Sequence, residues 1–411
     1  MTDGKNLLLA CLWQESEKLK ISRLRGLSEE EWEILLAEAS RHGLVPFIFK
    51  TVKPYYPDPH IQIHFQDKMR RVYYQSAARN MRLFRQLGKV LKKFSIAGIP
   101  AIVLKGAHLA GYVYDNIALR PMYDIDLLIM EEDLGSVHRL LIKDGYSNAK
   151  EGNPSYSKHL APYEKKDHIP LEIHFHIADP PLAERIDLSA LWKRSEKRFL
   201  EQAEISIYCP EDLFLYLCLH TCIQHVFNNG LIACIDVAQI IEHDRVKINW
   251  EQLWSRAGEW RIERAVYLML ALTERITGLP IPEQIDRKMQ FSEEIIEALA
   301  VAEELIHEEE EGTSRYLTRL FEKQSWRKKL SYLKQRAFLS GKSNYIESQQ
   351  TMGIKPFQQY QPYLLRLLKL FKAHRKTIWL GLRGDPQTVN AIEIQKRKNR
   401  LRDWLTHTGE N

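Results

Sequence analysis

The sequence predicts an α+β fold, in which a small mixed sheet is flanked along the chain by helical regions. Apolar residues with helical spacing fill residues 1–97 and return beyond residue 181, whereas residues 98–180 contain short runs with strand periodicity. We therefore expect an N-terminal helical region (1–97), an α/β core (98–180) and a C-terminal helical region (181–411). A chain of 411 residues is long enough for more than one hydrophobic core.

Composition limits the compartment and the partners. With 27% charged residues and no apolar run of membrane-spanning length, the sequence is typical of a soluble protein. The apolar stretch Leu7–Leu12 lies between Asp3 and Glu15, which makes it a poor signal peptide. Five cysteines without a pairing pattern favour reduced thiols. The net charge of +6 is too mild to indicate nucleic acid. We expect a cytoplasmic protein without membrane contact.

The N-terminal region contains two clear helix signals. Ser28 and Glu31 form a capping-box pattern, and the helix that they start is expected to end at Gly43. A longer amphipathic helix is expected over Ile61–Phe94, with Gly98 just beyond its end. Basic residues cover the face opposite its apolar stripe, and we interpret them as a solvated face.

The core opens with the apolar run Ile99–Leu104, which is too short for a helix and rich in branched residues. We therefore expect a buried strand. Lys105 and Gly106 end this strand, and Ala107–Tyr114 is expected to form a short helix. Gly106 then lies where a strand turns into a helix, so backbone N–H groups there can face a phosphate.

A second strand is expected over Tyr123–Met130, after a loop that carries Arg120. Asp124 and Asp126 lie two residues apart in this strand, so both carboxylates leave one face while the alternate residues point into the core. Neighbouring carboxylates repel each other, and a hard divalent cation relieves this repulsion because it prefers oxygen ligands. The pattern predicts a metal site.

The run Leu171–Ile177 alternates apolar and polar residues, with Glu172 and His174 on its polar side. If this strand lies beside the Asp124/Asp126 strand, Glu172 supplies a third carboxylate for two Mg²⁺ ions. The sequence does not establish that adjacency, and in the alternative interpretation Glu172 and His174 form the wet side of a hairpin. We give His174 a supporting role at the site.

The remaining elements complete the prediction. A helix is expected over Glu131–Lys143, and a strand over Tyr156–Glu164 that pairs with Leu171–Ile177. Beyond Pro181 the chain is expected to be helical, with helices over Leu213–His225, Ile232–His243, Trp250–Thr277 and Ser292–Glu311. Asp236 lies among aliphatic residues, and a buried aspartate needs a partner.

Three motifs resemble those of a family of uncharacterised bacterial nucleotidyltransferases within the DNA polymerase β superfamily. They are the Lys105-Gly106 turn after a strand, the run R-P-M-Y-D-I-D-L-L-I that starts at Arg120, and the E-I-H-F-H strand that starts at Glu172. The superfamily is marked by a Gly-Ser or Gly-Gly turn, a D-x-D or D-x-E strand and a later acidic residue, whereas this chain has Ala107 after Gly106. The resemblance is specific over Ile99–Ile129 and general in the flanking helices.

The resemblance implies a nucleotidyltransferase core that moves a nucleoside monophosphate from a nucleoside triphosphate, expected to be ATP, to a hydroxyl or phosphate acceptor. Asp124, Asp126 and Glu172 would be catalytic and would hold two Mg²⁺ ions. The candidate nucleotide-binding residues are Lys105, Gly106, Ala107, Arg120, His174 and Asp236. Family members are associated with peptide-tailoring and polysaccharide gene neighbourhoods, which implies natural-product tailoring on a small-molecule, peptide or sugar acceptor. Phosphoryl transfer with the same metals is a variant of this activity.

Other interpretations remain open. A catalytically inactive module could keep the fold and bind a nucleotide or a partner protein, and Ala107 favours that reading while the intact carboxylates oppose it. Arg82 or Arg85 could approach the triphosphate. Tyrosines among basic residues of the last third could suit an oligonucleotide, although the sequence contains no recognisable nucleic-acid module. The polar and thiol residues of the first C-terminal helices are interpreted as core or pocket-lining groups: Cys218, His220, Cys222 and His225.

Overall fold

The structure of the chain is a computed structural model, and it describes residues 4–12, 16–148, 158–200, 203–243, 248–288, 292–308 and 386–406. The chain divides into two compact units. The first holds the described residues up to His307, and the second holds Glu308 and helix α18 (Pro386–Thr406). The tyrosine-containing basic stretch of the last third, which the sequence left open as an oligonucleotide site, lies outside the described residues.

The N-terminal region is helical, as the sequence predicts. Ser28 caps α3 with a full capping box, because its side chain accepts the Glu31 N–H while the Glu31 carboxylate accepts the Ser28 N–H. The predicted long helix is α5, displaced by two residues at each end. The elements are α1 (Gly4–Leu12), α2 (Glu17–Arg25), α3 (Glu29–Arg41), α4 (Val45–Val52), the short η1 (Lys53–Tyr55) and α5 (Ile63–Ile96).

A seven-stranded mixed sheet forms the centre of the first unit, and its strand order is β3-β4-β5-β2-β1-β7-β6. The β2–β5 and β1–β7 pairs are parallel and the other pairs are antiparallel. The strands are β1 (Ile102–Val103), β2 (Ile125–Leu128), β3 (Ser147–Asn148), β4 (Tyr163–Glu164), β5 (Leu171–His174), β6 (Glu196–Leu200) and β7 (Ala203–Ile207). The predicted α+β class with a mixed sheet is confirmed.

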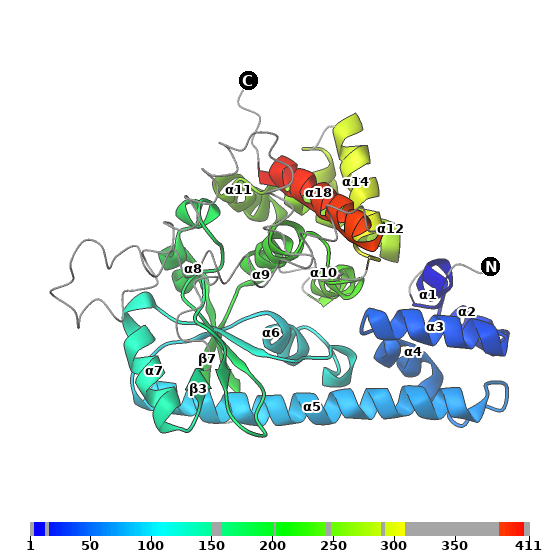
Figure 1. Cartoon of the computed structure of the whole chain (residues 1–411), viewed down its shortest axis with the longest axis horizontal. Helices are drawn as coiled ribbons and strands as arrows, with labels where there is room; N and C mark the ends of the chain where they lie inside the picture. The colour runs from blue at the N-terminus through cyan, green and yellow to red at the C-terminus, as the bar shows by residue number, and fades with distance from the viewer. Residues whose placement is uncertain are drawn as a thin grey trace. The chain divides into compact units, whose positions relative to one another are not determined.

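One face of the sheet is covered by α5 and α7 (Leu134–Lys143). Their apolar side chains form one buried cluster with Ile125 and Leu127 of β2 and Ile173 of β5. Figure 1 shows α5 running along this side of the sheet. Because side chains alternate across a strand, Asp126 and Glu172 leave the opposite face. The hydrophobic core therefore fixes which face carries the carboxylates.

The sequence prediction of a purely helical chain beyond Pro181 is wrong, since β6 and β7 form a hairpin within the sheet. Strand β6 alternates between half-buried and exposed residues and has no buried side, so its sequence lacks the apolar alternation that marks a strand. Its Phe199 is 72% exposed. Residues 196–200 form a strand because they pair with β7, which in turn pairs with β1.

Four of the predicted elements have different bounds. The strand predicted over Ile99–Leu104 is reduced to the two residues of β1, and the helix after it, α6 (Lys105–Tyr112), begins two residues early. The single helix predicted over Trp250–Thr277 is two helices, because Arg261 adopts a left-handed conformation with φ of 56° between them. The predicted strand Tyr156–Glu164 retains only β4, and Tyr156 lies outside the described residues.

The helices after the sheet pack into an apolar layer that contains the free, buried Cys218, Cys222 and Cys234, while the free Cys209 is half-buried and the free, buried Cys11 belongs to α1. The helix predicted over Leu213–His225 begins as α9 and continues from Leu219 as a π-helical turn, η5. The elements are η2 (Ile117–Leu119), η3 (Glu131–Asp133), η4 (Leu182–Arg185), α8 (Leu188–Arg194), α9 (Pro210–Cys218), η5 (Leu219–Gln224), α10 (Ile232–His243), α11 (Trp250–Trp260), α12 (Glu263–Thr277), α13 (Glu283–Asp286) and α14 (Glu293–Leu305).

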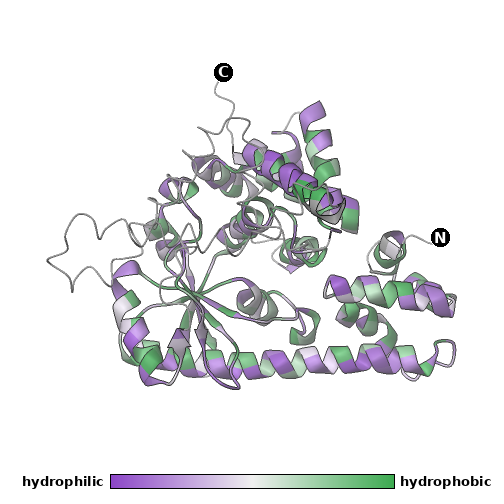
Figure 2. Ribbon diagram, viewed as in Figure 1, coloured by the Kyte–Doolittle hydropathy of each residue, from purple (hydrophilic) through white to green (hydrophobic). Residues whose placement is uncertain are grey.

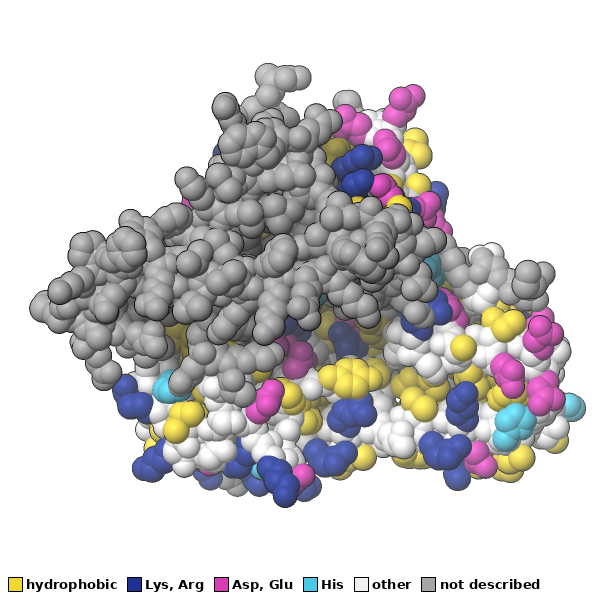
Figure 3. Space-filling view, viewed as in Figure 1, with side chains coloured by type: hydrophobic (Ala, Val, Ile, Leu, Met, Phe, Trp, Pro, Cys, Tyr) yellow, Lys and Arg dark blue, Asp and Glu magenta, His cyan; other side chains and the backbone are white. Residues whose placement is uncertain are grey.

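The surface of α5 is strongly basic. Hydrophilic and hydrophobic residues alternate along the helix (Figure 2), and Lys and Arg side chains follow it on the visible surface (Figure 3). Arg82 and Arg85 are both exposed, as expected for a solvated helix face. Within the described ranges, no helix has the length and apolar character needed to cross a membrane.

His108 on α6 is a buried histidine that should make stability depend on pH. Burial, together with the Arg198 charge, lowers the pKa of His108 to about 3. An unfolded histidine has a pKa of about 6.5, so below that pH the unfolded chain binds a proton at His108 while the folded chain keeps the ring neutral. Stability is therefore lost as pH falls from about 6.5 towards 3, by about 1.4 kcal/mol per pH unit.

We expect the wild type to lose about 2 kcal/mol more unfolding free energy between pH 7 and pH 5 than His108→Leu does, because leucine cannot be protonated. Urea denaturation of both proteins at the two pH values measures this difference. The exposed His60 provides the control, since His60→Leu should keep the pH dependence of the wild type. Parallel pH profiles for wild type and His108→Leu would contradict the prediction.

Candidate functional site

The carboxylates of β2 and β5 are neighbours on the open face of the sheet. The two strands run parallel, and Asp126 lies directly opposite Glu172 in their register. Side-chain oxygen atoms of Asp126 and Glu172 and a ring nitrogen of His174 all lie within 4.8 Å of one another. The adjacency that the sequence left open is therefore present, and it follows from the apolar faces of both strands packing on α5 and α7.

Asp126 is the centre of this group and is 2% exposed. Lys105 Nζ donates to its Oδ1 at 2.8 Å, and His174 Nε2 lies 2.8 Å from the same oxygen. Burial alone would favour the neutral acid, but the Lys105 charge and the His174 hydrogen bond outweigh it and hold the pKa of Asp126 well below its usual range. Asp126 is therefore a fixed anion at the site.

Lys105 reaches Asp126 from an uncommon backbone conformation. Its φ is 43°, in the left-handed region that residues with side chains rarely adopt. Burial disfavours its charge, but Asp126, helped by Asp124 and Glu172, outweighs burial and raises the pKa of Lys105. Local strain of this kind is found most often at functional sites.

Asp124 lies immediately before β2 and keeps solvent contact. Surrounding protein atoms displace part of the hydration of its carboxylate, and the Asp126 charge adds to this effect, so the pKa of Asp124 rises to about 6. Glu172 contributes in the same direction. Asp124 is thus a carboxylate whose negative charge is disfavoured by its neighbours.

These residues fit a divalent cation. A hard cation accepts carboxylate oxygen ligands, and its charge would relieve the repulsion between Asp124, Asp126 and Glu172. Two buried polar atoms beside the group, His174 Nδ1 and Tyr216 Oη, have no hydrogen-bond partner among the residues that the structure describes. Such atoms are rare in folded proteins and are found where a site takes a water molecule, an ion or a ligand.

Arg120 and Asp236 form a second group beside the first, and the Arg120 charge acts on Asp124. Arg120 Nε donates to Asp236 Oδ1 at 2.7 Å, and Tyr114 Oη donates to the same oxygen at 2.7 Å. Burial opposes the Arg120 charge, but Asp236 outweighs it and raises the pKa of Arg120. Asp236 is 2% exposed, so this pair braces α10 against the loop before β2. The partner that the sequence demanded for Asp236 is Arg120.

Gly106 and Ala107 lie in the first turn of α6, which begins two residues after β1 ends, so the predicted change from strand to helix occurs here. A Cβ atom added to Gly106 would lie 3.2 Å from Met122 Cγ, so close helix–loop packing accounts for this glycine. Ala107 is 2% exposed and belongs to the hydrophobic core. Neither residue needs a ligand to explain its size.

Sequence reasoning missed Lys158 and Gln224. Lys158 donates to Gln224 Oε1, and Gln224 in turn donates to the Ile177 carbonyl at 2.7 Å and lies 3.2 Å from His220 Nδ1. The electrostatic neighbours of Lys158 include Lys105, Asp126 and Glu172, so it belongs to the carboxylate site. No local pattern marks either residue, because they meet only through the tertiary fold.

The segment that carries Gln224 has an unusual backbone. It begins as the π-helical turn η5, and the next residues, Val226 and Phe227, have φ values of 48° and 61°. A left-handed β-branched residue is a true outlier, and π-helical turns occur often at functional sites. The segment also places His220 near the site, where burial and the Lys105 charge lower the pKa of His220.

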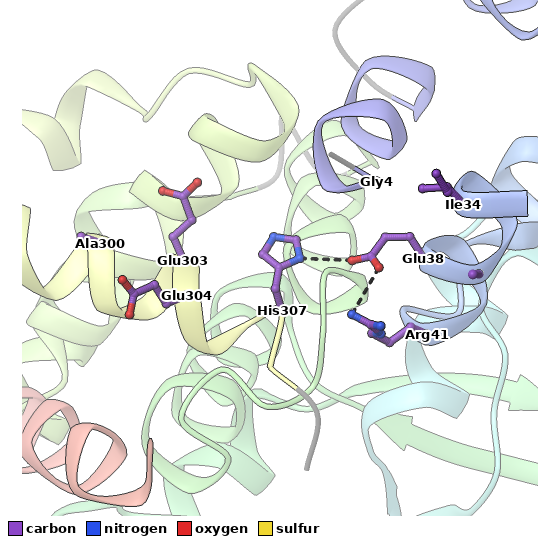
Figure 4. A pocket seen from close by; sticks show the side chains of 9 residues that line it. Gly4, Ile34, Glu38, Arg41, Ala300, Glu303, Glu304 and His307 are labelled. Atoms are coloured by element: carbon purple, nitrogen blue, oxygen red, sulfur yellow. Dashed lines mark ion pairs between the residues drawn. The ribbon is translucent and has the colours of Figure 1, made fainter. Parts of the chain in front are cut away.

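Another cluster consists of Glu38, His42 and His307. Glu38 and His307 line a pocket between α3 and α14 (Figure 4). The Leu231 N–H donates to His42 Nδ1 at 3.3 Å, so the proton of the neutral ring is on Nε2, which faces Glu38 Oε1 at 3.1 Å. Both ring nitrogens of His42 therefore have protein partners. These contacts account for His42, and His307 Nδ1 lies 3.5 Å from Glu38 Oε1.

Comparison with known proteins gives one positive result for this fold and site. A family model described as "Uncharacterised nucleotidyltransferase" matches residues 28–278, which is more than half of the chain. The matched part contains the carboxylates, Lys105, Lys158 and Gln224. No curated protein matches the chain.

Proposed function

The chain belongs to this family of uncharacterised nucleotidyltransferases, and from that membership we propose that it is a Mg²⁺-dependent enzyme. It transfers a nucleoside monophosphate from a nucleoside triphosphate, ATP in the first instance, to a hydroxyl or phosphate of a small molecule, peptide or sugar. The observation that carries this proposal is the pairing of Asp126 with Glu172 across parallel strands, on the face of the sheet that the core leaves open.

In this proposal Asp124, Asp126 and Glu172 hold the metal. Mg²⁺ bound there would neutralise phosphate oxygens and lower the pKa of an acceptor hydroxyl. Lys105 keeps Asp126 ionised, and His174 fixes the orientation of its carboxylate through the 2.8 Å hydrogen bond. Because a carboxylate only accepts hydrogen bonds, His174 Nε2 donates to Asp126, and in this proposal His174 acts as a positioning residue for that carboxylate.

The reaction is a substitution at the α-phosphorus. The acceptor oxygen forms a bond to phosphorus, the bond to the bridging oxygen of the β-phosphate breaks, and pyrophosphate leaves with that electron pair. The acceptor proton passes to solvent. The chain's own residues contribute position and charge, which is where most catalysis of phosphorus transfer comes from.

Mass spectrometry of candidate acceptors incubated with ATP and Mg²⁺ tests the proposal. We expect an acceptor to gain the mass of a nucleoside monophosphate with release of pyrophosphate, and we expect EDTA to abolish the gain because the carboxylates alone do not neutralise the triphosphate. A gain of one phosphate would instead assign phosphoryl transfer. Nucleotide binding without any product, across all four bases and all acceptor classes, would favour an inactive nucleotide-binding module.

A further inference from the structure

Three cationic side chains surround the carboxylate site, and two of them are already neutralised. Lys105 is bonded to Asp126 at 2.8 Å and Arg120 to Asp236 at 2.7 Å. In both pairs the carboxylate is buried, and breaking either pair to bind a phosphate would leave that carboxylate without its partner. The two cations that the sequence analysis assigned to the nucleotide are therefore already paired with carboxylates of the protein.

Lys158 is different. Its hydrogen-bond partner is the neutral amide oxygen of Gln224, and within the described part of the chain it forms no ion pair with a carboxylate, although Asp179, Asp126 and Glu172 favour its charge from a greater distance. The side chain is half-buried, so solvent compensates its charge only in part. Burial and the Lys105 charge lower the pKa of Lys158 to about 8. An anion with several negative charges would complete this environment.

The position of Lys158 is fixed from two sides. The Phe175 and His176 N–H groups donate to its carbonyl oxygen at 3.0 and 3.1 Å, which holds its backbone beside the end of β5. Gln224 holds the ammonium group, and Gln224 is itself held by Ile177 and His220. Lys158 therefore reaches the site from a segment that is bonded to the residues after β5, the strand that carries Glu172, and it is supported by the strained segment that begins at η5.

We propose that Lys158, positioned by Gln224, binds the polyphosphate tail of the substrate and the pyrophosphate that leaves. This inference rests on the proposed function, because it assumes that a nucleoside triphosphate occupies the carboxylate site. In this arrangement Lys158 contacts the β- and γ-phosphates, which a nucleoside monophosphate lacks. Loss of Lys158 should therefore lower the affinity for a triphosphate and not for a monophosphate.

The test compares the affinities of the full-length chain for inorganic tripolyphosphate, ATP and AMP, each with Mg²⁺, by calorimetry. Tripolyphosphate makes the result independent of base preference. Lys158→Met should weaken binding of tripolyphosphate and ATP about ten- to hundredfold, as for loss of a charged hydrogen bond, and leave AMP affinity unchanged. Lys158→Arg should retain much of the affinity. The exposed Lys166→Met removes the same charge from the β4–β5 turn and should match the wild type.

Gln224→Glu tests the positioning role without removing the lysine. A carboxylate at position 224 would pair with Lys158, so polyphosphate affinity should fall while circular dichroism and the melting temperature stay close to wild type. Equal affinities of wild type and Lys158→Met for tripolyphosphate and ATP would overturn this inference and leave the proposed function standing. Equal losses for AMP and ATP would also overturn it, by showing a structural role. A wild type that binds none of the three ligands would contradict the proposed function itself.

Discussion

Asp126→Asn is expected to reduce metal-dependent nucleotidyl transfer by at least about 10³-fold, because a neutral amide cannot replace the one carboxylate that is fixed as an anion at the centre of the site. Metal-assisted charge stabilisation contributes several kcal/mol, and each 1.36 kcal/mol corresponds to a tenfold rate change. Pyrophosphate release at saturating ATP and Mg²⁺, with the acceptor identified by mass spectrometry, measures the loss.

A control is needed because Asp126 is also buried between Lys105 and His174. Asp167→Asn removes a carboxylate from the exposed turn before β5, and asparagine tolerates the φ of 59° found there, so its activity should equal that of the wild type. Adding Lys105→Met to Asp126→Asn removes the unpaired cation. The double variant should regain part of the lost stability and none of the activity. Activity that returns with stability would remove Asp126 from the catalytic site.

Asp236→Asn is expected to lower the free energy of unfolding by about 3–5 kcal/mol, because it leaves the Arg120 guanidinium, which is only 19% exposed, without a carboxylate. Urea denaturation followed by circular dichroism measures the change. Glu242→Gln, on the exposed side of the same helix, should stay within about 0.5 kcal/mol of the wild type. Replacing both Arg120 and Asp236 by apolar residues should cost less than Asp236→Asn alone.

The same variants decide between bracing and nucleotide binding for this pair. If Asp236→Asn leaves stability unchanged and weakens ATP binding, Arg120 and Asp236 act on the nucleotide, as the family resemblance implies. If stability falls and the ATP affinity of the remaining folded protein is unchanged, the pair braces α10 against the loop before β2. The hydrogen bonds of Asp236 to Arg120 and Tyr114 favour the second result.

Much of the site was predictable from local patterns. The alternation around Asp124 and Asp126 and around Glu172 and His174 identifies two strands and the polar face of each, since successive side chains of any strand point to opposite sides. The buried Asp236 could be recognised as needing a partner because an isolated buried carboxylate is too costly. These statements depend only on residues near one another in the chain.

Other features depended on pairing between distant segments. Glu172 lies opposite Asp126 because β2 and β5 pair as parallel neighbours. The β6–β7 hairpin joins the sheet although β6 lacks the alternation of apolar residues that marks a strand. Arg120 was assigned to phosphate from its place in a loop, whereas the fold brings Asp236 to it from α10. No local sequence pattern predicts that Gln224 lies beside Lys158.

By itself, the sequence determined the family, the α+β class, the identity of the acidic residues and the face of each strand that carries them. The tertiary structure alone decided which cations are neutralised by buried carboxylates and which one, Lys158, faces a neutral amide. The reason is physical: side-chain direction along a strand follows from local backbone geometry, whereas charge compensation depends on which distant groups the packed core brings within a few ångströms.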